Sequence, residues 1–271
     1  MNIYTVDAFS SAPFQGNPAA VCIVRDEIDL GLMQRIAFEM NLSETAFVRV
    51  GEQPFGLRWF MPRVEVDLCG HATLASAHVL WETRLVEQED KIEFSTRSGI
   101  LTARKHGPWV EMDFPTEAPV ESPAPPFLSD ALGVRPLWVG RTRFDYLVEV
   151  GSEEVLRGIT PDFTLLAKVE CRGVIVTCGA QSGGCDFASR FFAPAVGINE
   201  DPVTGSAHCS LAPFWSGRTG KNSFTARQAS ERGGTLKVRA AGERTFIAGQ
   251  AVTVVRGETA PLFDSSGTAV S

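Results

Sequence analysis

The chain has 271 residues, of which 44% are hydrophobic and 21% charged, and its net charge at pH 7 is -7. This length suits two domains of ordinary size. The acidic balance argues against a nucleic-acid partner, because nucleic-acid binders usually present a basic face. It leaves room for a small anion, since a few oriented N–H donors can hold a carboxylate inside an acidic protein.

Nothing in the sequence indicates secretion or membrane insertion. The first residues have no basic stretch followed by an apolar one, and no apolar run approaches the ~20 residues of a membrane span. Six cysteines without a C-x-x-C pair fit a reduced setting, so we expect a cytoplasmic protein. No histidine pair has zinc-ligand spacing and no glycine run has nucleotide-binding spacing, so the sequence supports neither a metal hydrolase nor a nucleotide-binding protein.

The first half predicts strands, one amphipathic helix and more strands, in that order. The helix follows the second strand, and its apolar face is formed by Leu30, Met33, Ile36, Ala37 and Met40. The predicted strands cover residues 3–9, 19–24, 45–50, 57–61, 91–96, 100–105 and 109–114.

The second half begins after a proline-rich stretch, residues 114–127, which is typical of a linker. Thr160 predicts a helix N-cap with Pro161 at the first helical position. The predicted strands cover residues 144–150, 173–179, 189–194 and 251–257. We therefore expect domains at 1–117 and 118–271, with the last residues able to return to the first domain.

The two halves repeat one another. Five residues in one segment match five residues 135 positions later: Ser95, Arg97, Gly99, Leu101 and Arg104 match Ser230, Arg232, Gly234, Leu236 and Arg239. The same offset relates Gly70 to Gly205, and "RWFMP" at 58–62 matches "RFFAP" at 190–194. A shared offset in separate segments favours an internal duplication.

Each repeat contains one unusually apolar stretch. Residues 71–81 place apolar groups on every side of a helix, and such a helix must be buried all round. The second copy, residues 206–215, is similar, although Pro213 should bend the helix or end it early. We predict an α+β fold of two pseudo-symmetric domains, each a curved, mostly antiparallel, barrel-like sheet around a central buried helix.

The starts of the two predicted central helices are candidate anion sites. Each start carries unpaired N–H groups and about half a positive charge. Gly70 and Gly205, which open the two helices, let a ligand approach the backbone closely.

Four short motifs occur in an order that resembles the phenazine-biosynthesis PhzF-like isomerase family, part of the diaminopimelate-epimerase-like fold. They are "GNPAAV", "NLSETAF", "DLCGHAT" and "NEDPVTGSA", and the resemblance covers essentially the whole chain. It implies two similar domains with the active site between them, no metal or organic cofactor, and a homodimer.

The resemblance also implies roles for single residues. Glu44 would be the general acid/base, while His71 and Asp201 would orient the substrate and assist the proton transfer. The residues that the resemblance assigns to substrate binding are Asn17, Gly70, Gly205 and Ser206. The implied reaction is an isomerisation of a small carboxylate-bearing substrate.

These residue types suit such a reaction. Moving a proton between two carbons needs a group that removes it and returns it, and a carboxyl group in a dry cleft can do both. Helix starts can bind a carboxylate and stabilise the negative charge that develops as the proton leaves. Without the resemblance, Glu44, His71 and Asp201 would be interpreted as a solvated charge, a helix-start residue and a turn residue.

Cys69 keeps a second interpretation open. Diaminopimelate epimerases and proline racemases use two thiols, and Cys69 stands where one of these would lie. The repeat offset places Thr204 at the equivalent position, and a hydroxyl without an activating base is a poor replacement for a thiolate. A racemase or epimerase that uses Cys69 with Glu44 or another partner, and a non-catalytic binding protein of the same fold, stay as alternatives.

Overall fold

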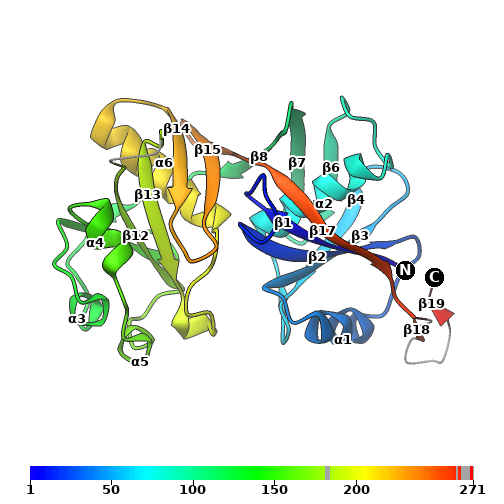
Figure 1. Ribbon diagram of the computed structural model, residues 1–271, viewed down its shortest axis with the longest axis horizontal. Helices are drawn as coiled ribbons and strands as arrows, with labels where there is room; N and C mark the ends of the chain where they lie inside the picture. The colour runs from blue at the N-terminus through cyan, green and yellow to red at the C-terminus, as the bar shows by residue number, and fades with distance from the viewer. Residues whose placement is uncertain (181–183, 261, 264–268, 271) are drawn as a thin grey trace. The chain divides into compact units, whose positions relative to one another are not determined.

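The computed structural model describes residues 1–180, 184–260, 262–263 and 269–270. The chain divides into two compact units, Met1–Asp113 with Ala248–Ser271 and Phe114–Ile247 (Figure 1). The boundary expected between residues 117 and 118 lies between Asp113 and Phe114, and the segment from Ala248 onward belongs to the first unit, a return that the expectation from sequence allowed for. There β17 (Ala251–Glu258) pairs antiparallel with β1 (Asn2–Ala8).

The first unit holds α1 (Leu30–Met40) and α2 (Gly70–Glu82). Its other strands are β2 (Asn17–Val24), β3 (Glu44–Arg49), β4 (Phe55–Phe60), β5 (Glu65–Val66), β6 (Ile92–Thr96), β7 (Gly99–His106) and β8 (Trp109–Pro115). A short hairpin, β18 (Leu262–Phe263) with β19 (Ala269–Val270), follows β17.

The second unit holds α3 (Leu128–Leu132), α4 (Glu153–Gly158), α5 (Phe163–Leu166) and α6 (Gly205–Thr219). Its strands are β9 (Val120–Glu121), β10 (Trp138–Arg141), β11 (Asp145–Glu149), β12 (Gly173–Gly179), β13 (Phe187–Phe192), β14 (Ser223–Gln228), β15 (Gly234–Ala241) and β16 (Arg244–Gly249). The stretch expected to be a linker therefore contains a short strand, β9, which pairs with β10.

The pairing of the strands confirms the duplication. In the first unit β1–β2 is antiparallel, β2–β3 parallel, β3–β4 antiparallel, β4–β6 parallel and β6–β7 antiparallel. In the second unit β10–β11, β11–β12, β12–β13, β13–β14 and β14–β15 follow the same order of directions. Five successive pairings thus agree, which two unrelated mixed sheets would not show by chance.

The central helices are buried as their composition requires. In α2 the buried residues are His71, Ala72, Thr73, Leu74, Ala75, Ser76, Ala77, Val79, Leu80 and Trp81. The helix packs against β1, β2, β3 and β17, so strands surround it. Its buried hydroxyls bond to its own backbone, Thr73 to the carbonyl of Cys69 and Ser76 to that of Ala72. This confirms the predicted arrangement of a sheet around one helix.

Pro213 does not end α6, so the structure excludes one of the two outcomes expected from sequence, an early end, and leaves the other, a bend. The helix continues to Thr219, six residues beyond the proline. A proline here deprives the carbonyl of Cys209 of its usual helical donor. The backbone N–H of Glu117 donates to that carbonyl instead, at 3.1 Å. Because a neighbouring segment satisfies the freed acceptor, the helix tolerates the proline.

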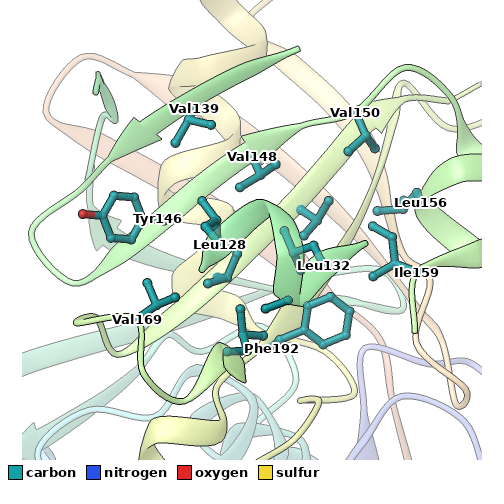
Figure 2. Packing of buried hydrophobic residues seen from close by; sticks show 14 of the residues in the cluster. Leu128, Leu132, Val139, Tyr146, Val148, Val150, Leu156, Ile159, Val169 and Phe192 are labelled. Atoms are coloured by element: carbon teal, nitrogen blue, oxygen red, sulfur yellow. The ribbon is translucent and has the colours of Figure 1, made fainter. Parts of the chain in front are cut away.

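Further helices cover the other face of each sheet. On α1 the residues Leu32, Met33, Ile36 and Ala37 are buried against β2, β3 and β4, whereas Leu30, expected on this face, is 49% exposed. In the second unit α3, α4 and α5 pack on β10 to β13. Figure 2 shows this core, which includes Leu128, Leu132 and Leu156 of the helices and Val148 and Phe192 of the strands.

Local capping decides where these outer helices begin. Asp29 caps α1 by accepting from the N–H of Leu32 at 3.1 Å. In α5 the cap is Asp162, whose carboxylate accepts from the N–H of Leu165, so the helix begins two residues later than the Thr160 cap predicts.

Within the described part of the chain, no helix is long and apolar enough to cross a membrane.

Candidate active site

Four residues of the first unit meet at one edge of its sheet. Asn17 begins β2 and Glu44 begins β3, and these strands are parallel, with Ala19 paired to Glu44. Parallel strands that are in register begin at the same edge, so both side chains lie there. Helix α2 also begins at this edge, with Cys69 at its N-cap position and His71 in its first turn. The structure thus assembles a cluster from residues that are far apart in sequence.

The imidazole of His71 is the centre of this cluster. Its Nε2 lies 3.0 Å from Oε2 of Glu44. Its Nδ1 lies 3.3 Å from Nδ2 of Asn17 and 3.5 Å from Sγ of Cys69. The side chains of His71 and Glu44 are 7% and 12% exposed. The ring therefore has a carboxyl group at one nitrogen and an amide and a thiol at the other.

The contact between His71 and Glu44 is an ion pair rather than an aligned hydrogen bond. The two atoms are close enough, but neither has a partner in hydrogen-bond geometry within the described structure. Small rotations of the two side chains would align them. Since catalytic hydrogen bonds often tighten only when substrate binds, this looser geometry is compatible with an acid/base pair.

Burial and charge shift the ionisation of this cluster. Burial lowers the pKa of His71, but the charges of Cys69 and Glu44 outweigh it and raise the pKa well above the ordinary value of 6.5. Burial raises the pKa of the Cys69 thiol, and the charge of Glu44 raises it further. Because Cys69 and Glu44 both raise the pKa of His71, these two neighbours together favour the protonated imidazole.

Glu44, Cys69 and His71 also have the donor types of a metal site, with their ligand atoms within 4.8 Å of one another. The local electrostatics oppose a cation. The cluster lies at the positive end of the α2 dipole, and the imidazole favours its protonated form. We therefore interpret the group as an acid/base cluster.

A second cluster lies at the start of α6 in the second unit. The hydroxyl of Thr204 donates to Oδ2 of Asp201, and the backbone N–H of Asp201 donates to the carbonyl of Phe191 at 3.0 Å. These bonds fix the turn that leads into the helix. Gly205 and Ser206 follow as its first two residues, the former buried and the latter half-buried.

Gln228 supports this turn, and sequence reasoning did not find it. Its Oε1 accepts from the N–H of Thr204 at 2.8 Å, and its Nε2 donates to the carbonyl of Asp201, also at 2.8 Å. The side chain is fully buried at the end of β14. No motif surrounds it in the sequence, so only the folded chain reveals this role.

The two central helices begin without a side-chain cap, as the short helix α3 also does. Side chains cap α1, α4 and α5, namely those of Asp29, Ser152 and Asp162. Neither α2 nor α6 has a side-chain cap hydrogen bond at its N-cap residue, Cys69 or Thr204. Their first-turn N–H groups are therefore not used up by a local cap, as an anion site requires.

The structure shows where the duplication has diverged. Thr45 pairs with Phe60 in the first unit and Val174 pairs with Phe192 in the second, so Glu44 corresponds to Gly173. A Cβ atom at Gly173 would lie 2.3 Å from the ring of Phe191, which leaves no room for a side chain. The carboxyl group of the first cluster thus has no counterpart at this position of the second unit.

Comparisons with known proteins agree with the fold. Residues 6–257 match the family described as phenazine biosynthesis-like protein, PhzC-PhzF. An uncharacterized isomerase of Halalkalibacterium halodurans is 56% identical over 257 residues, covering 94% of this chain and 97% of that protein. A PhzF-family crystal structure from Enterococcus faecalis has 42% identity and a TM-score of 0.92, covering 96% of this chain and 98% of that one.

A more distant structure shows the breadth of the fold. A probable proline racemase from Agrobacterium radiobacter has a TM-score of 0.64 at 12% identity, covering 96% of this chain and 92% of that one, which shows similarity of fold alone. The sheets wrapped around central helices are those of the diaminopimelate-epimerase-like fold. The chain belongs to the phenazine biosynthesis-like (PhzF) family of isomerases.

Proposed function

We propose that the protein is a cofactor-independent isomerase that moves a proton between two carbons of a small carboxylate-bearing substrate. Glu44 is the single acid/base. The observation that carries this proposal is the placement of its carboxyl group, which is 12% exposed and 3.0 Å from Nε2 of His71. A nearly dry carboxyl group beside an imidazole that favours its charged form is suited to accept a proton and return it.

In the proposed reaction, the Glu44 carboxylate removes a proton from one carbon, the electron pair of that C–H bond forms a new double bond to the neighbouring carbon, and the electron pair of the existing double bond moves to its far carbon. Glu44 then returns the same proton to the far carbon of that system. The imidazolium of His71 stabilises the carboxylate before and after the transfer. The number of protons and electrons is unchanged, so no oxidant or reductant is needed.

The second cluster takes part in substrate binding in this proposal. Asp201 accepts hydrogen bonds from hydroxyl or amino groups of the substrate, and Gly70, Gly205 and Ser206, each at a helix start, are candidate residues for binding an anionic group. Thr204 and Gln228 hold Asp201 in place through the bonds described above. A homodimer and a cytoplasmic location stay predictions.

The test is proton exchange at carbon in deuterated water with a panel of small unsaturated and amino acids. A substrate of the wild type should lose exchange by about 100-fold or more in Glu44→Gln, the range of general acid/base catalysis. The matched control is Glu27→Gln, because Glu27 is 88% exposed and pairs only with Arg49 in the described structure. Exchange that survives in Glu44→Gln would reject Glu44 as the base.

A racemase that uses Cys69 is the second candidate, because Sγ of this residue lies 3.5 Å from Nδ1 of His71. Against it, the equivalent position in the second unit is Thr204, whose hydroxyl donates to Asp201. Loss of turnover in Cys69→Ala together with activity in Glu44→Gln would favour the racemase. Substrate binding without any exchange would favour a non-catalytic binding protein.

A further inference from the structure

Asn17 has a defined orientation beside His71. It is fully buried at the first residue of β2. The hydroxyl of Ser43 donates to its Oδ1 at 3.4 Å, and its Nδ2 lies 3.3 Å from Nδ1 of His71. The hydroxyl thus holds the carbonyl end of the amide, and the NH₂ end is directed at the imidazole.

This orientation decides which nitrogen of a neutral ring carries the proton. An amide NH₂ group only donates, so Nδ1 of His71 must accept and be unprotonated. The thiol of Cys69, 3.5 Å from the same nitrogen, is a second donor as long as it is protonated. The one proton of a neutral His71 must then be on Nε2, the nitrogen 3.0 Å from Glu44.

We propose that Asn17, held by Ser43, is a positioning residue that fixes the tautomer of His71, so that the proton of the neutral ring is always directed at Glu44. This inference rests on the proposed function, since the side of the ring that carries the proton matters only if Glu44 moves protons. It assigns Asn17 a role through His71, in place of the direct substrate contact that the resemblance implies.

The groups around His71 act in opposite directions on the protonation of its ring. Glu44 on β3 favours the imidazolium, whereas the NH₂ group of Asn17 opposes a proton on Nδ1. The charged residues of the other packed strands are engaged elsewhere: Asp7 on β1 accepts from the N–H of Phe14 at 2.6 Å, and Arg256 on β17 pairs with Glu82 at the other end of α2. Asn17, Cys69 and Glu44 are therefore the groups next to the ring that set its protonation.

His208 supplies an internal reference with the opposite tautomer. Its Nδ1 lies 2.8 Å from the carbonyl oxygen of Thr204, which only accepts, so Nδ1 must carry the proton. Burial lowers the pKa of His208 to about 4, so the ring is neutral at pH 7. One protein thus contains two buried imidazoles that should report opposite tautomers.

The experiment is nitrogen NMR of protein labelled with ¹⁵N in its histidine side chains, which requires no substrate. His71→Gln identifies the signals of His71. Above the pKa of His71, the wild type should show a protonated Nε2 and an unprotonated Nδ1, while His208 shows the reverse. In Asn17→Asp a carboxylate faces Nδ1, so the ring should stay doubly protonated and its titration midpoint should rise by about one pH unit or more.

Ser43→Ala provides a second variant that perturbs the fold less. Without the hydroxyl, the amide of Asn17 loses one of the bonds that orient it, and the share of the other tautomer of His71 should rise. His208 should keep its signals in both variants, which controls for general unfolding. A wild-type His71 with a protonated Nδ1 in its neutral form, or a tautomer unaffected by either variant, would overturn the proposal.

The two proposals fail separately. If Glu44→Gln abolishes exchange but His71 carries its proton on Nδ1, Glu44 stands as the base and the positioning role of Asn17 is wrong. If the tautomer is as expected but no substrate shows exchange that depends on Glu44, the hydrogen-bond arrangement stands and the isomerase mechanism is wrong.

Discussion

Gly16 is the position where a single methyl group should do most harm at the first cluster. Its φ of +70° is unfavourable for any residue with a Cβ atom. An added Cβ would lie 2.1 Å from the carbonyl oxygen of Ala8, a backbone atom that cannot move aside alone. Ala8 pairs with Asn17 across β1 and β2, so the clash acts on the residue that we propose positions His71.

Gly107 separates the two effects in Gly16→Ala. It has a φ of +60°, and a Cβ there would meet nothing within 4 Å. Gly107→Ala should therefore lower the free energy of unfolding by about 1–2 kcal/mol, the cost of a left-handed L-residue. Gly16→Ala adds a crowding cost of about 1–3 kcal/mol, which gives about 2–5 kcal/mol in all.

Urea unfolding of the two variants and the wild type measures these differences. Both glycines lie in the first unit, so the same transition reports on both. The tautomer of His71 gives a second readout, which Gly16→Ala should disturb and Gly107→Ala should not. If the two variants lose equal stability, the close approach of Gly16 to Ala8 has no energetic weight and the reasoning is refuted.

Two further predictions concern α2. Leu80→Ala should lower the free energy of unfolding by about 2–5 kcal/mol, because Leu80 is fully buried. The control is Leu85→Ala, at a residue that is 44% exposed, which should lower it by about 1 kcal/mol or less. Similar losses for the two variants in urea unfolding would contradict a helix that is buried all round. His71 has a raised pKa when folded, so its contribution to stability is complete below pH ~6.5 and is lost as the pH rises through the folded pKa. Stability measured against pH should therefore fall over that window in the wild type and lose this component in His71→Gln; an unchanged profile would show that the pKa of His71 is not raised.

The parts of the fold that depend on a local pattern or on repetition could be predicted from the sequence. The shared offset between Gly70 and Gly205 predicted two equivalent central helices, and the pairing of the strands confirms this. The apolar composition of residues 71–81 predicted burial on every side, which is also observed. In both cases the residues of the segment itself are enough for the prediction, and no contact with a distant segment has to be known.

What the sequence did not reveal depends on contacts between distant segments. Pro213 lies within a helix because Glu117 satisfies the carbonyl of Cys209, and nothing near Pro213 indicates that donor. Gln228 and Ser43 support their clusters from strand ends that carry no distinguishing pattern for this role. Glu44 and His71 were placed by the resemblance, while their 3.0 Å separation follows from the parallel register of β2 and β3 and the start of α2.

The return of β17 to the first unit has a consequence for the order in which the chain is made. Residues 114–247 form an uninterrupted stretch, so the second unit can complete its contacts while synthesis continues. The first unit must wait, because β1 pairs with both β2 and β17 and the latter is made about 240 residues after β1. Until then β1 exposes an unpaired edge, the kind of surface to which other strands add. A strand made near the end of synthesis, β17, therefore closes the edge of the first strand to be made.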